Sequence, residues 1–216
     1  MAEMKRWAWL AAAGFVCAAC QGSVPSLHGT GKSGYGAIIV RGQATTPSGE
    51  TRRARLALGF ESDQMRYLIP FTPGHATMYV IEPGRYRVTP ARGPFGISLD
   101  TLDVVVEGRS LSAPFPRDIL RLDEIEVKPR HVVPIGILKV DVARKTGERR
   151  VHVRATLDTS KDSRRRLVEE KVQQMLDPRV DSDERDTAVS WNSAIDQALL
   201  DVQSAPDLHP AFKARQ

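Results

Sequence analysis

Residues 132–157 read VVPIGILKVDVARKTGERRVHVRATL, and this stretch decides the fold class. Two runs rich in Val, Ile and Leu, Val132 to Val142 and Arg149 to Leu157, flank the turn-forming Lys145-Thr146-Gly147. Successive side chains of a strand reach opposite faces of a sheet, so such runs bury one face. Two of them joined by a short turn that contains glycine form an antiparallel pair. The stretch therefore predicts a β-hairpin.

Short runs of the same kind recur upstream, separated by turn residues. Arg53 to Phe60 (RARLALGF) is the clearest, because apolar residues occupy every second position: Ala54, Leu56, Leu58 and Phe60. Ala76 to Ile81, the turn Glu82-Pro83-Gly84 and Arg85 to Thr89 predict a second hairpin. The remaining runs are Gly36 to Arg41, Met65 to Ile69, Ile97 to Val106 and Glu124 to Val127. We expect a mainly β domain over residues 35–157, a β-sandwich of about seven or eight short strands that buries two such faces.

Helical spacing replaces alternation after the last strand. Thr159 to Asp162 has the Ser/Thr-x-x-Asp form of a helix start, and Asp177-Pro178 ends that helix. A second helix opens at Ser182-Asp183-Glu184, with Asp183 as its cap or as a partner of the helix dipole. Its apolar residues recur at alternating spacings of three and four: Ala188, Trp191, Ile195, Ala198 and Val202. We expect two C-terminal α-helices over residues 158–203, docked on the sandwich or on each other, or presenting a seam for a partner protein.

Two segments carry a resemblance to a known family. Tyr79 to Val88 (YVIEPGRYRV) and Ile125 to Val140 (IEVKPRHVVPIGILKV) are similar to segments of small bacterial lipoproteins with a prealbumin-like β-sandwich domain. In the second segment Arg130 follows the turn proline where the family pattern prefers glycine, and Pro134 stands where it favours tyrosine. The resemblance implies a scaffold and a location, and it assigns no catalytic residue.

The first twenty residues have the order of an export signal. Basic Lys5-Arg6 precedes the apolar run Trp7 to Val16, which is too short to span a membrane as a helix. Ala18-Ala19, directly before Cys20, resembles the lipobox of bacterial lipoproteins, in which the cysteine thiol receives a diacylglycerol. We therefore expect a lipoprotein signal peptide over residues 1–19 and lipidation of Cys20.

The residues after Cys20 bear on the destination of the protein. Gln21 stands where aspartate would signal retention in the inner membrane, so we expect an outer-membrane anchor that faces the periplasm or the cell surface. Residues 20–34 are rich in Gly, Ser and Pro, which predicts a flexible tether. Residues 204–216 predict a loosely ordered tail. Cleavage by an ordinary signal peptidase near Ala19 or Gly22 would instead release a soluble periplasmic protein.

Residue types that support catalysis or metal binding are scattered. The five histidines are His28, His75, His131, His152 and His209, and none pairs with another at metal-ligand spacing. His152 is expected on the exposed face of its strand, and His75 and His131 border turns that only tertiary folding could bring together. Gly31-Lys32-Ser33 lacks the earlier glycine of a phosphate-binding loop. No cysteine follows Cys20, so the body of the chain has no disulfide. We expect no catalytic residue, no metal and no cofactor.

The net charge and its distribution bear on which partners the protein could bind. The formal charge of +5 is dispersed among acidic residues, which argues against a nucleic-acid partner. The leading hypothesis is a non-enzymatic binding or structural module of the cell envelope, held to the membrane by its lipid and partnered by an envelope protein or glycan. The alternatives are a periplasmic small-ligand carrier, which needs a deep apolar cavity, and a hydrolase whose site forms only in the tertiary structure.

Overall fold

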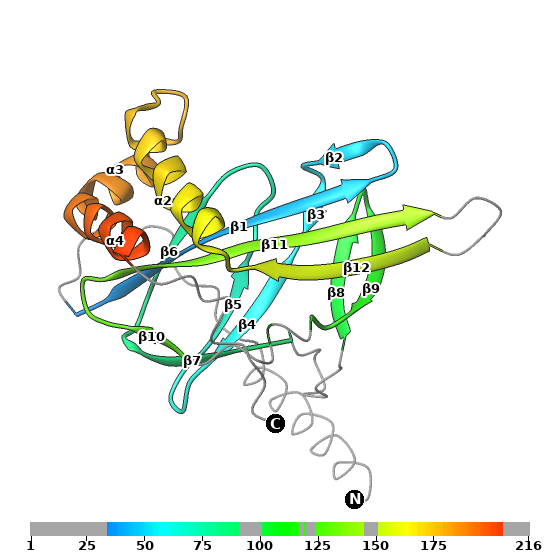
Figure 1. Cartoon of the computed structure of the whole chain (residues 1–216), viewed down its shortest axis with the longest axis horizontal. Coiled ribbons are helices and arrows are strands. Elements are labelled where there is room, and N and C mark those ends of the chain that lie inside the picture. Colours follow the sequence, from blue (N-terminus) through cyan, green and yellow to red (C-terminus); the bar gives the residue numbers. More distant parts are fainter. Residues whose placement is uncertain (1–33, 91–100, 117–118, 120–123, 145–150, 205–216) are drawn as a thin grey trace, which may run out of the picture.

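The computed structural model describes residues 34–90, 101–116, 119, 124–144 and 151–204. Within these residues the protein has three layers (Figure 1). Helices lie on one face of a five-stranded sheet, and two smaller sheets cover the other face. Of the described residues, 50% lie in strands and 26% in helices, so the structure is mainly β. The predicted β-sandwich followed by C-terminal helices is confirmed.

The five-stranded sheet is built around two long parallel strands, β1 (Gly36–Thr46) and β11 (Val132–Arg144). β12 (Val151–Asp158) pairs antiparallel with β11, which confirms the hairpin predicted for this stretch; its connection lies outside the described residues. On the other side of β1, β6 (Thr77–Ile81) pairs with the first half of the strand and β2 (Gly49–Thr51) with its end.

The facing layer consists of two sheets. The four-stranded sheet has the order β10 (Ile125–Val127), β7 (Gly84–Thr89), β4 (Ala57–Glu61) and β5 (Arg66–Pro70). The three-stranded sheet has the order β3 (Ala54–Arg55), β8 (Thr101–Val106) and β9 (Arg109–Pro114). Side chains from both sheets and from the five-stranded sheet form one apolar core, which includes Ile38, Phe60, Tyr86, Leu102 and Leu138.

One predicted hairpin is wrong, and one predicted strand is divided in two. Residues 76–89 do not form a hairpin, because β6 pairs with β1 whereas β7 pairs with β4 and β10 in the facing layer. The predicted strand over residues 53–60 divides at Leu56, since β3 joins β8 and β4 joins β5 and β7. Alternation reveals that a strand has a buried face. Both layers bury their faces in the same core, so the pattern is the same whether the chain turns back or crosses over.

The described residues contain twelve strands, more than were predicted. Apart from the division at Leu56, the additional strands are β2 and β9. β9 (RSLSAP) is rich in serine and buries a single residue, Ala113, and β2 (GET) buries none. Strands with so few apolar side chains give no recognisable alternation.

β1 explains why the chain forms three layers. Residues 37–40 are fully buried on both faces of the sheet, with exposed fractions of 0%. Ile38 and Val40 enter the sandwich core, whereas Ala37 and Ile39 face the helices. A strand that is apolar on both faces is stable only between two covering layers.

The helices are α2 (Lys161–Leu176), α3 (Ser182–Ser190) and α4 (Asn192–Ser204), and they dock on the sheet. Ser160 and Asp181 cap α2 and α3, each one or two residues away from the predicted position. The second predicted helix is divided at Trp191, whose N–H donates to the Ala188 carbonyl at 3.1 Å and ends α3. The apolar residues keep their spacing of three and four across this break, so this spacing alone predicts one continuous helix.

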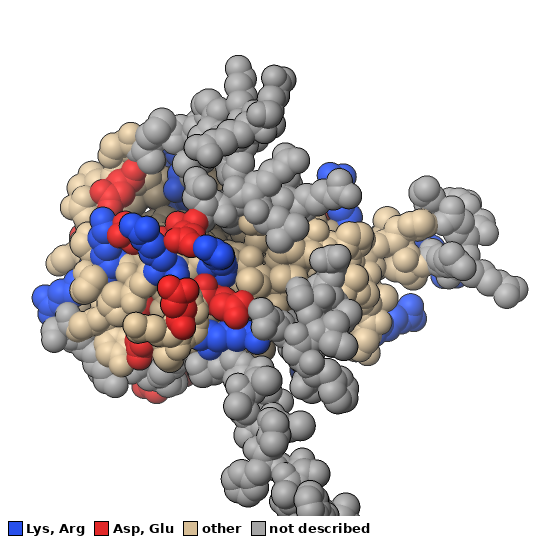
Figure 2. Space-filling view, turned by 90° about the horizontal axis from the view of Figure 1, so that it is seen from below, with Lys and Arg blue, Asp and Glu red and all other residues tan. Residues whose placement is uncertain are grey.

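The outer face of the four-stranded sheet is charged. Seen from below, basic and acidic side chains are interspersed over this layer (Figure 2). Arg87 lies 2.8 Å from Glu124, Lys128 lies 3.3 Å from Glu126, and Arg85 stands opposite Glu126 on the neighbouring strand. Exposed charges that compensate one another in this way suit contact with water.

Candidate functional site

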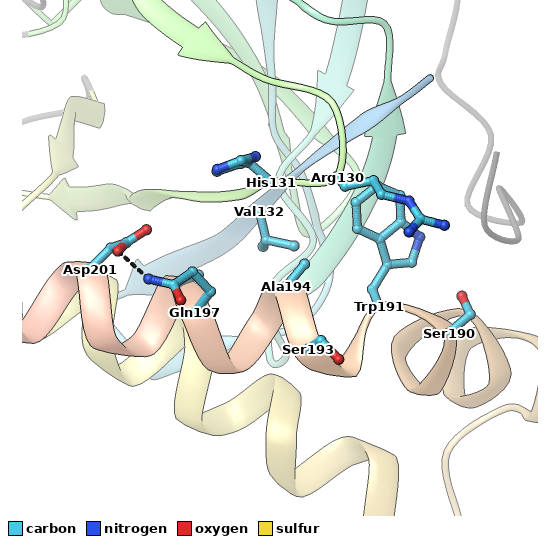
Figure 3. Close-up of a pocket in the computed structure, with 10 residues that line it drawn as sticks. Arg130, His131, Val132, Ser190, Trp191, Ser193, Ala194, Gln197 and Asp201 are labelled. Carbon is cyan, nitrogen blue, oxygen red and sulfur yellow. Dashed lines mark hydrogen bonds between the residues drawn. The ribbon is translucent and has the colours of Figure 1, made fainter. Parts of the chain in front are cut away.

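A groove runs between helix α4 and the turn that joins β10 to β11 (Figure 3). It consists of two adjoining hollows of about 290 and 270 Å³. One wall is formed by residues 126–134, the other by residues 190–202, and Arg164 of α2 lies at one end. His131, Val132, Ala198 and Asp201 belong to both hollows, so the two form one continuous site, termed the α4 groove.

The groove exists because the facing side chains of α4 are small. Ala194 and Ala198 lie one turn apart on the helix, where Val132 points from β11 toward it (Figure 3). Alanine extends too little to close the space between helix and strand. Trp191, 5% exposed, forms the floor at one end. The result is an apolar floor beneath a polar rim that includes Ser193 of α4.

The opposite wall is the turn Lys128-Pro129-Arg130-His131. The His131 N–H donates to the Lys128 carbonyl at 3.2 Å, and Pro129 occupies the second position, where its fixed φ suits the turn. Arg130 has φ +57°, which glycine adopts freely and a residue with a side chain adopts at a cost of about 1 kcal/mol. Its N–H donates to the Tyr35 carbonyl at 2.7 Å, which holds the turn against the start of β1. An arginine side chain is thus kept where the backbone favours glycine.

Polar groups converge on the groove from both walls. His131 Nδ1 lies 2.9 Å from the Pro129 carbonyl, and because a carbonyl only accepts, Nδ1 carries the proton and Nε2 is left for a ligand. On the facing helix, Gln197 donates to Asp201 at 2.8 Å. The Arg130 guanidinium makes no hydrogen bond or ion pair with another described residue. In Figure 3 Arg130 extends toward Trp191, whereas His131 lies toward Asp201.

A second and more polar hollow, of about 530 Å³, lies between α2 and α3 and is lined by His75, Glu170 and Glu184 among others. Next to it Lys171 is fully buried, and its Nζ donates to Glu184 at 2.7 Å and to Gln174 at 2.8 Å. Burial lowers the pKa of Lys171, and the Glu184 carboxylate only partly opposes that effect. This ammonium is sealed from solvent and joins two helices, which is a structural role.

The fold separates the histidines that border turns. His75 lines the hollow between α2 and α3, and His131 lines the α4 groove. No group of three His, Cys, Asp or Glu side chains in the described part of the chain is placed to hold a metal ion. His152 is exposed on β12, as predicted.

Of the other residues singled out in the sequence, the structure describes Asp183 and leaves the rest undescribed. Asp183 lies in the first turn of α3, where Asp181 is the cap, so the dipole interpretation holds for it. Cys20, His28, His209 and Gly31-Lys32-Ser33 lie outside the described residues. Within the described ranges, no helix has the length and apolar character needed to cross a membrane.

The α4 groove itself was not predicted from the sequence. Its two walls are far apart along the chain, and the apolar stripe of α4 gives no sign of where the helix stands away from the sheet. One local signal was present: Arg130 follows a proline at a turn position that glycine would fill at least cost.

Comparison of the chain with known protein families, with curated proteins and with solved structures gives no match.

Proposed function

We propose that this protein is a lipid-anchored, non-enzymatic binding module of the bacterial cell envelope, and that it holds an envelope partner in the α4 groove. One observation carries the binding role: an apolar floor on which a few polar groups converge is the usual character of a binding site. The signal-like first twenty residues, the lipobox-like Ala18-Ala19-Cys20 and the resemblance to small lipoproteins support the location.

The point where the chain enters the domain supports the link between anchor and groove. Tyr35 accepts a hydrogen bond from Arg130 at 2.7 Å, so the described chain begins beside the groove. An extended chain from Cys20 to Tyr35 spans at most about 50 Å. A lipid on Cys20 would therefore keep the groove within that distance of the bilayer.

Site-specific photo-crosslinking in the native membrane tests the binding role. A benzophenone side chain placed at Ser193, on the groove rim, should give a discrete crosslinked product. The same group at Leu200, on α4 but outside the groove and 56% exposed, should give none.

A filled groove provides the second comparison. Ala194→Tyr places a large ring in the groove and should abolish the Ser193 product, whereas Leu200→Tyr adds a ring outside it and should leave the product unchanged. Equal products at Ser193 and Leu200, or a Ser193 product that survives Ala194→Tyr in a folded protein, would refute the groove as the binding site. Circular dichroism checks that each variant is folded.

A further inference from the structure

Few buried side chains hold helix α3 to the rest of the protein. Of its nine residues only Thr187 and Ala188 are buried, and the helix packs mainly against α2. The connecting residues 177–181 precede it, and Trp191 alone separates it from α4. A helix that buries so little apolar surface opens at a lower free energy than its neighbours.

A buried ion pair adds a second contact between α3 and α2. The Lys171 side chain of α2, 1% exposed, donates to Glu184 of α3 at 2.7 Å. Glu170 is also near Lys171, but its two oxygens accept from Arg41 at 3.0 Å and from the Ala76 N–H at 2.9 Å. Among the described residues Glu184 is therefore the one carboxylate that Lys171 contacts. A buried charge that loses such a partner is strongly destabilising.

The position of α3 also shapes the α4 groove. Ser190, its last residue, and Trp191, the residue after it, both line the groove, with Trp191 as the floor at that end (Figure 3). The Trp191 N–H donates to the Ala188 carbonyl of α3 at 3.1 Å, and its carbonyl accepts from the Ile195 N–H of α4 at 2.9 Å. Because Trp191 is bonded to both helices, a movement of α3 would change the groove floor.

We propose that α3 is a hinged segment that turns about Trp191, and that its closed position, held by Lys171 and Glu184, is the one in which the α4 groove binds its partner. This inference rests on the proposed function and adds a means of controlling the same groove. The hollow of about 530 Å³ between α2 and α3 gives the helix room to move. A partner that contacts Ser190 or Trp191 favours the closed position, and loss of the Glu184 charge favours the open one.

Trp191 reports the position of α3. The tryptophans of the chain are Trp7, Trp9 and Trp191, so the full chain with Trp7→Phe and Trp9→Phe, held in detergent, fluoresces from Trp191 alone. In this background Glu184→Gln should shift the emission to longer wavelength and increase quenching by acrylamide, because Trp191, 5% exposed in the closed position, meets water. The further change Lys171→Met should reverse both effects, since no unpaired charge then remains.

Hydrogen exchange locates the movement within the chain. Without the Glu184 change, the amides of α3 should exchange faster than those of α2 and α4, which bury more residues. Glu184→Gln should speed exchange in α3 at least about a hundredfold, the factor that corresponds to the loss of one partner of a buried ion pair. The amides of β4 and β7 should keep their rates.

Two control variants separate a movement of α3 from other effects. Asp186→Asn removes an exposed charge from the same helix and should leave Trp191 emission and α3 exchange unchanged. Ile38→Ala destabilises the sandwich core and should also leave Trp191 emission unchanged, because Ile38 lies in the other core. Equal effects of Ile38→Ala and Glu184→Gln on Trp191 would mean a general loosening and would overturn the hinge.

The remaining outcomes test the hinge and its link to the groove separately. An unchanged Trp191 spectrum in folded Glu184→Gln would overturn the hinge, and so would α3 amides that are no less protected than those of α2 before any change at Glu184. The photo-crosslink at Ser193 should weaken with Glu184→Gln and return with Lys171→Met. A crosslink that persists while Trp191 is exposed would overturn the control of binding. Absence of the crosslink without either change would remove the proposed function, whereas the fluorescence and exchange results would still decide whether α3 moves.

Discussion

Lys171 is a buried ammonium whose charge depends on one carboxylate. Its Nζ lies 2.7 Å from Glu184, and its side chain is 1% exposed. Removing one partner of such a pair leaves an uncompensated buried charge, whereas replacing both partners by uncharged groups is often close to neutral. We expect Glu184→Gln to lower the free energy of unfolding by about 3 kcal/mol near pH 7, and the further change Lys171→Met to restore most of it. Urea denaturation measures both, and equal losses from Glu184→Gln with and without Lys171 would contradict the coupling.

The pH dependence of stability gives an independent check on the same residue. Burial lowers the pKa of Lys171 from 10.5, so between the two values the unfolded chain binds more protons than the folded chain. The free energy of unfolding then gains a contribution from Lys171 as the pH rises toward 10.5. Relative to Lys171→Met, the wild type should become more stable between about pH 7 and about pH 10. A constant difference over this range would show that the lysine is not desolvated.

At the scale of elements, Asp158 joins the end of β12 to the start of α2. Its carboxylate accepts from Lys139 at 2.7 Å, from Ser163 at 2.8 Å and from the Ser160 N–H at 3.1 Å. Burial alone would raise the pKa of Asp158, but these hydrogen bonds outweigh it and hold the pKa well below its ordinary value of 3.8. The junction is thus stabilised by an ionised carboxylate.

We expect Asp158→Asn to lower the free energy of unfolding by about 2 kcal/mol at neutral pH. The carboxylate's contribution is complete above its unfolded pKa of 3.8 and is lost as the pH falls toward the folded value. The difference between wild type and Asp158→Asn should therefore shrink between about pH 6 and about pH 3 in urea denaturation. Asp141→Asn, at an exposed position of β11, is the matched control and should have little effect at either pH.

β1 offers a test of the layered architecture, because neighbouring residues serve different cores. Ile38 packs in the sandwich and Ile39 under the helices, both 0% exposed. Each change to alanine should cost about 2–5 kcal/mol, through lost burial and the cavity left behind. Hydrogen exchange should separate them: Ile39→Ala should loosen α2 and α4 before the β4 and β7 amides, and Ile38→Ala should do the reverse. Identical exchange patterns would mean that the layers unfold as a single unit.

How far the sequence predicts this structure differs from element to element. The hairpin of β11 and β12 follows from local pattern, because both arms and the turn lie in one stretch. The crossing from β6 to β7 does not, since alternation shows a buried face without showing which sheet the strand joins. The parallel pairing of β1 with β11 joins segments far apart along the chain, and no local pattern encodes it. The α4 groove is harder still to predict from the sequence, because it depends on where α4 stands away from the sheet. The only local indication was Arg130, which occupies a turn position that favours glycine.

The α4 groove lies beside the point where the described chain enters the domain, because the Arg130 N–H donates to the Tyr35 carbonyl at 2.7 Å. The described chain begins at the groove, beside Arg130, and the paired charges of Glu126 and Lys128 also line the groove. In a chain anchored through Cys20, the groove would be the part of the domain tied closest to the tether. Partners are then to be sought among proteins that reach the membrane surface.

The anchor itself is tested by comparing the only two cysteines, Cys17 and Cys20. In the native host grown with labelled palmitate, we expect label in the wild type and in Cys17→Ser and none in Cys20→Ser, because the thiol of Cys20 is the proposed site of the diacylglycerol. Mass spectrometry of the wild-type N-terminal peptide should find a chain that begins at diacylated Cys20. A single acyl chain binds a bilayer only marginally, at about 0.8 kcal/mol for each buried CH₂, so two chains on one residue would suffice for stable attachment. An unmodified chain that begins near Gln21 would make the protein soluble in the periplasm. The link between membrane and groove would then fall, whereas the binding role of the groove would still be tested by the crosslink at Ser193.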